Sequence, residues 1–185
     1  PGLDEVCGLE PRAREWLEIC PDTAEPQQLL IRLDLGLDGK GRDVLYETNA
    51  TALAGFNYHS QAVHLLKHIV FPRLGLAGRL EDSPNLLGFL HDWILRAAGG
   101  RPRVGFVEEP PFTPGDTEMP QVALYLRSRG LKAVWGTPQE VSRGRGGFFL
   151  RGQPVDWLYR DIAFKELPSP DSPRLSAFRE MIKTW

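Results

Sequence analysis

The feature that most constrains this chain is a pair of alternating apolar and polar runs joined by a turn. The first run, LLIRLDLGL at residues 29–37, has a period of two from residue 30 on, which is typical of a half-buried strand. The sequence DGKGRD follows and is a strong turn signal. The second run, VLYETN at residues 44–49, alternates again. These residues are therefore predicted to form a β-hairpin with one apolar face.

Polar side chains with metal-binding chemistry gather on this predicted hairpin. Residues two apart on a strand point the same way, so strict alternation puts Leu45 on the same face as Glu47 and Asn49 of the second run. Because paired strands lie about 5 Å apart, four polar groups are expected to converge on one patch. Carboxylate and amide oxygens are typical Mg²⁺ ligands, and an adjacent arginine can hold a transferring phosphoryl group, but the pattern also fits the charged outer face of any half-exposed hairpin. The four residues are Arg32, Asp34, Glu47 and Asn49.

The segments on either side of the hairpin are predicted to be helical. Residues 11–19 form a short helix in a lead-in to the fold, with Trp16 and Leu17 on its apolar side. Helical spacing returns at residues 58–70, where the following Pro72 is expected to stop the helix because proline cannot continue the hydrogen-bond ladder.

The pattern then changes toward an α/β unit. A helix capped by Asp82 or Ser83 precedes residues 103–107 (RVGFV), a nearly continuous apolar run typical of a buried parallel strand. A loop, a helix at residues 119–129 and a strand at residues 132–135 follow, which is the order of a parallel β-α-β unit.

The last third of the chain is predicted to hold a second hairpin and a final helix. Residues 148–150 and 155–159 are separated by RGQP and are expected to pair with each other. After a proline-rich stretch, residues 174–185 form a last helix.

Charge and composition exclude several function classes. The formal net charge of −2 gives no reason to expect a nucleic-acid partner, and the basic SRGRGG segment around Arg143 and Arg145 is interpreted as a flexible loop. Two cysteines, Cys7 and Cys20, form neither a metal motif nor a disulfide framework, so a reducing cytoplasm is expected. No apolar run approaches the roughly 18 residues that span a membrane.

Two further groups of polar residues are considered and set aside. His64 and His68 lie one helical turn apart but have no third ligand at a matching spacing, so they are interpreted as helix-surface histidines. Glu108 and Glu109 follow a predicted parallel strand, where ligands commonly bind. Because adjacent strand residues point to opposite faces, a paired-carboxylate hydrolase is not expected there.

Two stretches resemble one enzyme family. The segment RLDLGLDGKGRDVLYETNATALAGF resembles the R-x-D strand, turn and E-x-N strand of the glutathione synthetase and glutathionylspermidine synthase group of ATP-grasp ligases. The stretch from RVGFVEEP to VDWLYRDI resembles a domain of circularly permuted members, whose last strand reads V-D-x-x-Y-R-R. In this chain Asp161 replaces the second arginine of that strand. The resemblance covers residues 29–167.

The resemblance implies roles for individual residues. Family members activate a carboxylate with ATP to give an acyl phosphate, which an amine then attacks. By the motif match, Arg32 contacts the acyl phosphate, while Asp34, Glu47 and Asn49 hold Mg²⁺ ions that bridge the nucleotide phosphates. Thr51 lines the acceptor-substrate pocket, although Leu53 and Ala54 depart from the serine-rich glutathione-type version. Tyr159 and Arg160 contact substrate or dock domains, with a strand tyrosine and a solvated neighbour as the equal alternative.

The expected function is therefore the N-terminal portion of an ATP-dependent carboxylate-amine ligase, with Mg²⁺ and ATP as cofactors and a small-molecule carboxylate and amine as substrates. The permuted arrangement implies that C-terminal ATP-grasp lobes bind the nucleotide, because the glycine-rich residues 143–147 do not open a helix. Ligation by these 185 residues alone is not expected. The alternative is a non-catalytic binding or interaction domain with a related fold.

The expected fold class is α/β, with a β-hairpin and helices followed by a small Rossmann-like, parallel-sheet domain of the pre-ATP-grasp type. Residues 1–100 are expected to form the metal- and acceptor-binding hairpin and helices, residues 101–167 the parallel-sheet segment, and residues 168–185 a linker and a truncated helix. No nucleic-acid or membrane partner is expected.

Overall fold

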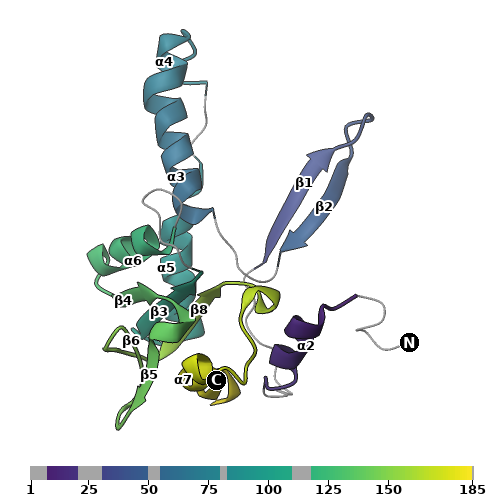
Figure 1. Cartoon of the computed structure of the whole chain (residues 1–185). Coiled ribbons are helices and arrows are strands. Elements are labelled where there is room, and N and C mark those ends of the chain that lie inside the picture. The colour runs from purple at the N-terminus through teal and green to yellow at the C-terminus, as the bar shows by residue number, and fades with distance from the viewer. Residues whose placement is uncertain (1–7, 21–30, 50–54, 80–82, 110–117, 185) are drawn as a thin grey trace.

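The computed structural model describes residues 8–20, 31–49, 55–79, 83–109 and 118–184. In its first half the elements are α2 (Pro11–Leu17), β1 (Arg32–Leu37), β2 (Asp43–Asn49), α3 (Phe56–Leu65), the π-helical turn η1 (Leu66–Val70), α4 (Phe71–Arg73) and α5 (Leu86–Ala97). In the second half they are β3 (Arg103–Glu108), α6 (Met119–Ser128), β4 (Lys132–Gly136), η2 (Pro138–Glu140), β5 (Val141–Gly144), β6 (Gly147–Leu150), β7 (Gln153–Val155), β8 (Trp157–Asp161), η3 (Phe164–Glu166), η4 (Pro173–Leu175) and α7 (Ser176–Thr184). The β1–β2 hairpin and the long helix project from a mixed α/β body (Figure 1).

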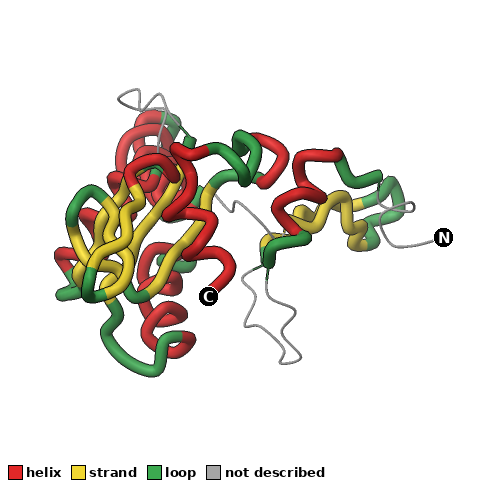
Figure 2. The backbone as a smooth tube through the Cα atoms, turned by 60° about the horizontal axis from the view of Figure 1, so that its bottom comes forward, coloured by secondary structure: helices red, strands yellow, loops and turns green. Residues whose placement is uncertain are grey.

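A three-stranded parallel sheet in the order β4–β3–β8 forms the centre of the body. Its middle strand β3 carries the apolar run that predicted a buried parallel strand, and five of its six residues are buried. Alternate β3 side chains enter two different cores, since Phe106 faces one and Val107 the other. A second view shows helices on both sides of these strands and the β1–β2 hairpin set apart from the sheet (Figure 2). The prediction of a parallel β-α-β unit is confirmed in this part of the chain.

The second predicted hairpin is only half right. β6 pairs with β7 through a two-residue turn in which Arg151 and Gly152 both have positive φ (51° and 72°), as a tight hairpin turn requires. The pairing ends at Val155, because Asp156 leaves the hairpin and binds the start of β3, its amide donating to the Arg103 carbonyl at 2.8 Å. Residues 157–161 therefore join the parallel sheet as β8 instead of the hairpin.

The glycine-rich segment that was interpreted as a flexible loop is part of a sheet. β5 and β6 pair antiparallel with Gly144 opposite Gly147, so the segment forms a strand and the tight turn after it. Arg143 lies on β5, with its guanidinium 3.7 Å from the Glu180 carboxylate. As predicted, this segment does not open a helix.

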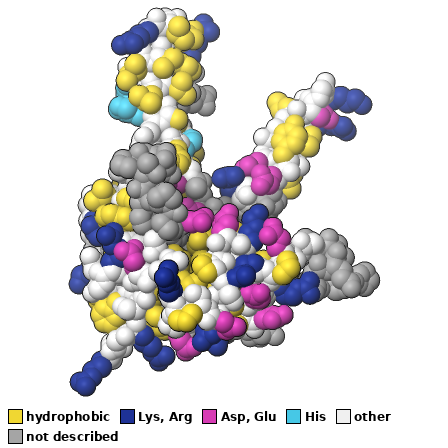
Figure 3. Space-filling model, in the orientation of Figure 1, with side chains coloured by type: hydrophobic (Ala, Val, Ile, Leu, Met, Phe, Trp, Pro, Cys, Tyr) yellow, Lys and Arg dark blue, Asp and Glu magenta, His cyan; other side chains and the backbone are white. Residues whose placement is uncertain are grey.

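The long helix is longer than predicted. It starts at Phe56 and runs through α3, η1 and α4 to Arg73. Pro72 therefore lies inside the final turn of the helix and not beyond its last residue, as had been predicted. The chain then leaves the helix with Gly75 at φ 70°, a conformation that glycine adopts without strain. Apolar side chains on this projecting helix are exposed, as the space-filling view shows (Figure 3): Leu65, Leu66, Ile69 and Val70.

The helix α5 begins at a different cap from the two proposed. The side chain of Asn85 accepts a hydrogen bond from the Gly88 amide at 2.9 Å, which satisfies one of the open donors at the helix start. Ser83 lies upstream of this cap, and Asp82 lies outside the described residues. The apolar side chains Leu87, Leu90 and Ile94 form a buried stripe along α5.

Two hydrophobic cores cover the two faces of the parallel sheet. The first joins Phe56 and the α5 stripe to the sheet and α6, so side chains from before and after residue 100 share one core. The second is built by β5–β7, α2 and α7.

The lead-in helix α2 is part of the second core. Its Trp16 is fully buried, stacks on Phe164 at a centroid distance of 6.0 Å, and donates from Nε1 to the Pro168 carbonyl at 2.9 Å. Phe178 of α7 contacts the same ring edge-on. Leu17, which was expected on the apolar side, is exposed. The start and the end of the described chain thus stabilise each other, because residues 168–184 contribute side chains to the second core.

The β1–β2 hairpin is fully formed but is not half-buried as predicted. Leu33, Leu35 and Leu37 share one face and are 54%, 60% and 65% exposed. Alternation in the sequence thus predicted the strand correctly. Burial of its apolar face would require another element packed against it, which the described residues do not supply.

No helix within the described ranges combines the length and apolar character needed to cross a membrane.

Candidate functional site

The hairpin register brings the four predicted polar residues together. Arg32 lies directly opposite Asn49, and Asp34 lies directly opposite Glu47, in an antiparallel pair. Residues that face each other across such a pair have their Cβ atoms about 5 Å apart and on the same side. We call these four residues the hairpin patch.

A β-bulge makes this register possible and corrects one prediction. The pairing shifts between Asp34 and Leu35, so Tyr46 is the extra residue on β2 and Leu45 pairs with Leu35. Strict alternation had placed Leu45 with the polar residues, whereas the bulge moves it to the apolar face. The ring of Tyr46 lies against Gly36, where any added Cβ would collide with it. Glycine is therefore required at this position for the tyrosine to lie across the strand.

Hydrogen bonds join the members of the hairpin patch. Arg32 donates from Nε to Asp34 Oδ1 at 2.8 Å and from Nη2 to Asp34 Oδ2 at 3.2 Å. With its amide turned to match its neighbours, Asn49 donates to Glu47 Oε1 at 3.0 Å and accepts from Arg32 Nη2 at 3.0 Å. The hydrogen bond to Asp34 raises the pKa of Arg32 above its usual value, and the nearby Asp34 and Glu47 charges add to this. All four side chains thus form one network that is open to solvent.

The turn of the hairpin is held by Asp38. Its carboxylate accepts from the amides of Lys40 and Arg42, at 2.8 and 3.0 Å, and from Arg42 Nε at 2.7 Å. These hydrogen bonds, first among them that from the Arg42 amide, lower the pKa of Asp38. Because the turn fixes the register, this carboxylate helps to position the hairpin patch without belonging to it.

The hairpin patch offers part of the set of oxygen ligands that Mg²⁺ requires. In the part of the chain that is described, no three His, Cys, Asp or Glu side chains are grouped so that they could hold a metal ion. His64 and His68 are exposed on the long helix, as predicted, with ring centroids 4.7 Å apart. The patch offers two carboxylates and an amide, and Mg²⁺ is usually held by one or two carboxylates together with phosphate and water oxygens. The patch therefore fits a phosphate-bridged ion and not an all-protein metal site.

The other predicted site residues lie elsewhere. Tyr159 is buried on β8 between Phe56 and Phe106, with ring centroids 6.5 and 5.6 Å away, and burial raises the pKa of its hydroxyl. Arg160 points to the other face of the sheet, where its guanidinium lies 4.0 Å from the Phe164 ring centroid and donates to the Ile162 carbonyl. Its pKa is lowered, chiefly by burial. Both residues belong to the sheet and not to the hairpin patch, and Thr51 lies outside the described residues.

Sequence reasoning missed an acidic cluster at the carboxyl ends of the parallel strands. Glu108 ends β3 and lies directly beside Asp161, which ends β8. Glu118 precedes α6, is 2% exposed, and caps the start of α3 by accepting from the amides of Gly55 at 2.6 Å and Asn57. We call Glu108, Glu118 and Asp161 the acidic cluster.

Burial changes the acid-base properties of the acidic cluster. It raises the pKa of Glu108 to about 7, with Asp161 and Glu118 adding to the effect and the Met119 amide opposing it. Burial also raises the pKa of Asp161 to about 6, with Glu118 and Glu166 adding and Arg160 opposing. Glu108 Oε1 is buried and has no hydrogen-bond partner among the residues that the structure describes. A carboxyl group with a pKa near neutrality can take up or release a proton, which is the property of a general acid or base.

One signal could have found this cluster. Ligands and catalytic groups commonly lie at the carboxyl ends of parallel strands, and both Glu108 and Asp161 end such strands. Glu109 was weighed as the partner of Glu108, and the prediction that these two residues point apart is consistent with Glu109 being exposed. The actual partner comes from β8, which was predicted to belong to a hairpin.

Comparison with protein-family models finds none that matches this chain, and comparison with curated proteins finds none either. The resemblance to ATP-grasp ligases therefore rests on the motif residues alone.

Proposed function

We propose that this chain supplies the Mg²⁺-phosphate corner of an ATP-dependent carboxylate-amine ligase of the circularly permuted ATP-grasp kind. The observation that carries the proposal is the hairpin register, in which Arg32 faces Asn49 and Asp34 faces Glu47 within one hydrogen-bonded patch. A charged hairpin surface without a role needs no such convergence of two carboxylates, an amide and a guanidinium. The spacing of the R-x-D and E-x-N motifs matches what this chemistry requires.

Each residue of the hairpin patch has a defined task in this proposal. Asp34, Glu47 and Asn49 supply the oxygens that hold Mg²⁺ against the nucleotide phosphates. A bound Mg²⁺ supplies positive charge that offsets the charge on the transferring phosphoryl group. Arg32 donates to Asp34 in this structure. In the proposal its guanidinium turns toward an acyl phosphate, with which it can form two parallel hydrogen bonds.

The body supports a second part of the proposal, a Rossmann-like pre-ATP-grasp unit that binds substrate. Its sheet is parallel, and the acidic cluster lies at the carboxyl ends of β3 and β8, where such sheets commonly bind ligands. An amine must lose a proton when it attacks an acyl phosphate, and Glu108 has a pKa of about 7, which suits a proton acceptor. Tyr159 and Arg160 would serve this unit by holding β8 in place, not by touching substrate.

The exposed apolar surfaces support a third part of the proposal. The leucine face of the hairpin and the apolar side chains of the long helix both lie on projections from the body (Figure 3). Apolar surface of this extent usually meets other protein. We assign that place to the nucleotide-binding lobes that the family resemblance implies, which would close over the hairpin patch.

Mn²⁺ offers a direct test of the hairpin patch, because its electron paramagnetic resonance signal reports binding in the presence of ATP. We expect weak Mn²⁺-ATP binding by the chain and no ATP turnover. Glu47→Gln removes one anionic ligand and should weaken binding by about tenfold or more. Asp43→Asn is the matched control, since Asp43 lies on the same hairpin but pairs with Leu37 on the opposite face.

Equal binding by wild type and Glu47→Gln would remove this residue from the metal site. ATP turnover by the chain alone would contradict the statement that it holds only part of the site. In the complete ligase, Glu47→Gln should abolish ligation while leaving the thermal unfolding midpoint unchanged.

The exposed leucine face also favours a second candidate, a non-catalytic interaction domain with an ATP-grasp-related fold. Leu35 is 60% exposed on a strand whose opposite face is polar, which suits docking through the hairpin. If the chain does not bind Mn²⁺-ATP, and if Glu47→Gln binds the partner protein as well as wild type does, this candidate would be favoured over the ligase.

A further inference from the structure

The projecting long helix carries two histidines that are four residues apart and open to solvent. His64 lies in α3, His68 lies in the π-helical turn η1, and both side chains are exposed. Their ring centroids are 4.7 Å apart, with an angle of 46° between the ring planes. Histidine is visible on this projection in the space-filling view (Figure 3). We call these two residues the histidine pair.

The distance between the two rings is the distance that one shared metal ion requires. A metal bound at an imidazole nitrogen lies about 3.2 Å from the ring centroid, because the metal–nitrogen bond is about 2.0–2.1 Å. With both rings directed at one ion, a centroid separation of 4.7 Å corresponds to an angle of about 95° at the ion. A tetrahedral angle would need a separation of about 5.2 Å. The spacing therefore fits two adjacent positions of a square-planar or octahedral ion better than those of a tetrahedral one.

The backbone departs from α-helical geometry at the second histidine. The turn η1 covers Leu66–Val70, and the Phe71 amide donates to the Leu66 carbonyl, five residues earlier. Such π-helical turns are rare, and they occur frequently at functional sites. Because a π-helical turn holds more residues than an α-helical one, it changes the direction in which His68 points relative to His64. The unusual backbone and the close ring pair thus coincide at one place on the helix.

The ring nitrogens of the histidine pair are not used by the fold. The other two histidines each have a polar partner: His59 Nε2 lies 2.6 Å from Ser83 Oγ, and His91 Nδ1 lies 2.8 Å from Asp92 Oδ1. Within the described ranges, the histidine pair makes no hydrogen bond or ion pair, and its two rings contact each other instead. The four ring nitrogens of the pair are therefore accessible to a ligand from solvent.

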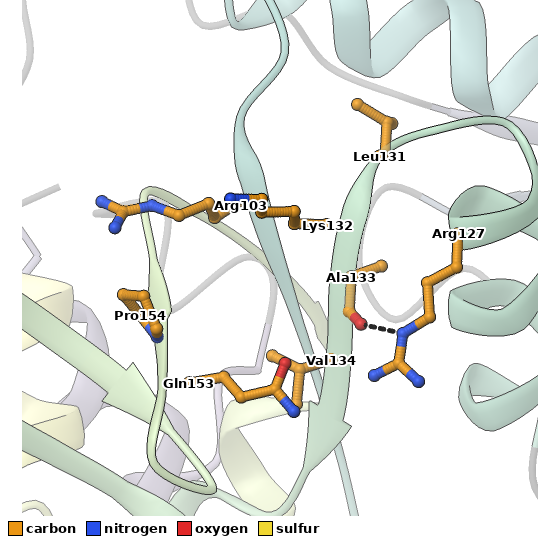
Figure 4. Close-up of a pocket in the computed structure, with 8 residues that line it drawn as sticks. All are labelled: Arg103, Arg127, Leu131, Lys132, Ala133, Val134, Gln153 and Pro154. Carbon is orange, nitrogen blue, oxygen red and sulfur yellow. Dashed lines mark hydrogen bonds between the residues drawn. The ribbon is translucent and has the colours of Figure 1, made fainter.

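A cationic cavity in the body shows, by contrast, what the histidine pair has that other polar groups lack. Arg103, Arg127 and Lys132 line a cavity of about 370 Å³ beside β4. Figure 4 shows Arg127 on one side of β4 and the other two cations on the opposite side. No single ligand group meets the three cations together, whereas one ion can lie between the two rings of the histidine pair.

We propose that His64 and His68 together bind one divalent transition-metal ion of the Ni²⁺ or Cu²⁺ type. Histidines at positions i and i+4 on one helix face are an arrangement that holds metal ions in proteins. Imidazole nitrogens suit these ions, and square-planar or tetragonal nitrogen and oxygen sites are typical of Cu²⁺ and Ni²⁺. Water completes the coordination, so the site needs no third protein ligand. It is separate from the hairpin patch and does not depend on the proposed ligase function.

Ni²⁺ and Cu²⁺ salts, added alone to the chain at pH 7.5, test this site. Isothermal titration with Ni²⁺ should show one saturable site per chain. With one equivalent of Cu²⁺, pulsed electron paramagnetic resonance should detect coupling to the remote nitrogens of two imidazole rings. The two measurements report different properties, since the first gives the affinity and the second counts the rings on the ion.

Matched variants assign the site to the histidine pair. His64→Gln and His68→Gln should each weaken Ni²⁺ binding by about a hundredfold, because the two imidazoles no longer act on one ion as linked ligands. Both positions are exposed and glutamine is a good helix former, so these variants should fold as wild type does. His91→Gln is the control, since it removes an imidazole of α5 that lies beside Asp92. Glu47→Gln should also leave Ni²⁺ binding unchanged.

Three results would overturn this proposal: equal Ni²⁺ affinity of wild type and His68→Gln, coupling of Cu²⁺ to only one imidazole, or an equal loss of affinity in His91→Gln. Each would leave His64 and His68 as two rings that contact each other on the helix surface without holding an ion. A loss of Ni²⁺ binding in Glu47→Gln, with full binding by His68→Gln, would likewise overturn it by placing the ion at the hairpin patch.

Discussion

The two acidic sites of this protein differ in their contact with water, and the difference separates what each can bind. On the hairpin, Asp34 and Glu47 are open to solvent and are matched by a guanidinium and an amide. In the body, Glu108 is 5% exposed and lies beside Asp161, and one of its oxygens has no hydrogen-bond partner within the described part of the chain. Solvated carboxylates are suited to hold a cation, whereas buried carboxylates are suited to hold a proton. The proposed function accordingly assigns metal binding to the hairpin and proton transfer to the body.

The two regions also differ in what stabilises them. The hairpin is held by its own ladder and by the turn at Asp38, while the body is held by side chains that are distant in sequence. Trp16 shows this most clearly, because it joins α2 to the segment around Pro168. We therefore expect substitutions in the two regions to report on different unfolding events.

The largest expected effect comes from Trp16→Ala. Removing a fully buried tryptophan should lower the free energy of unfolding by about 3–5 kcal/mol, measured by urea denaturation. Leu17→Ala, at the exposed neighbouring position, should change it by less than about 1 kcal/mol. Leu35→Ala on the hairpin should be similarly mild. If Leu35→Ala were as destabilising as Trp16→Ala, the hairpin would share the core of the body, and the comparison would fail.

An intermediate effect is expected from the pH dependence of Glu108. Its pKa is about 7 in the folded protein against 4.5 for an ordinary glutamate, so between these values the folded protein binds more protons than the unfolded chain. Its contribution to stability is therefore fully present below about pH 4.5 and falls by up to roughly 3 kcal/mol as the pH rises to about 7. The pKa of Asp161 is likewise raised, from 3.8 to about 6, so its contribution to stability also falls as the pH rises between these values.

Glu108→Gln removes this titration. The variant should be more stable than wild type at about pH 8, and the gain should vanish at about pH 4, in urea denaturation at both values. Glu109→Gln is the matched control, because Glu109 is the exposed neighbour of Glu108 and its replacement should leave the pH profile unchanged. A Glu108→Gln profile parallel to that of wild type would show that Glu108 is not the protonated group.

The smallest effect is expected from Asp38→Ala in the hairpin turn. This change removes the carboxylate that accepts from Lys40 and Arg42, so the β1–β2 amides should exchange hydrogen faster. Amides of β3 should exchange at the wild-type rate, because they belong to the core of the body. Faster exchange in both regions would mean that the hairpin and the body unfold as one unit.

The sequence was most informative where structure follows from local pattern. The alternation at residues 29–37 and 44–49 predicted the hairpin and the convergence of its polar residues, and the apolar run at residues 103–107 predicted the buried parallel strand. It failed where pairing partners are distant. Nothing local in residues 157–161 indicates that they join β3 instead of continuing the hairpin from β7. The bulge at Tyr46 likewise depends on both strands at once.

By itself, the sequence determined which side chains could meet on the hairpin, because residues of one strand pair and its turn are neighbours along the chain. It also predicted the order of β3, α6 and β4 in the body. Only the tertiary structure decided that Glu108, Glu118 and Asp161 lie together at one end of the sheet and that Trp16 belongs to the second core. The physical reason is that burial and pKa depend on the elements that pack around a residue, and these come from segments far apart in the chain.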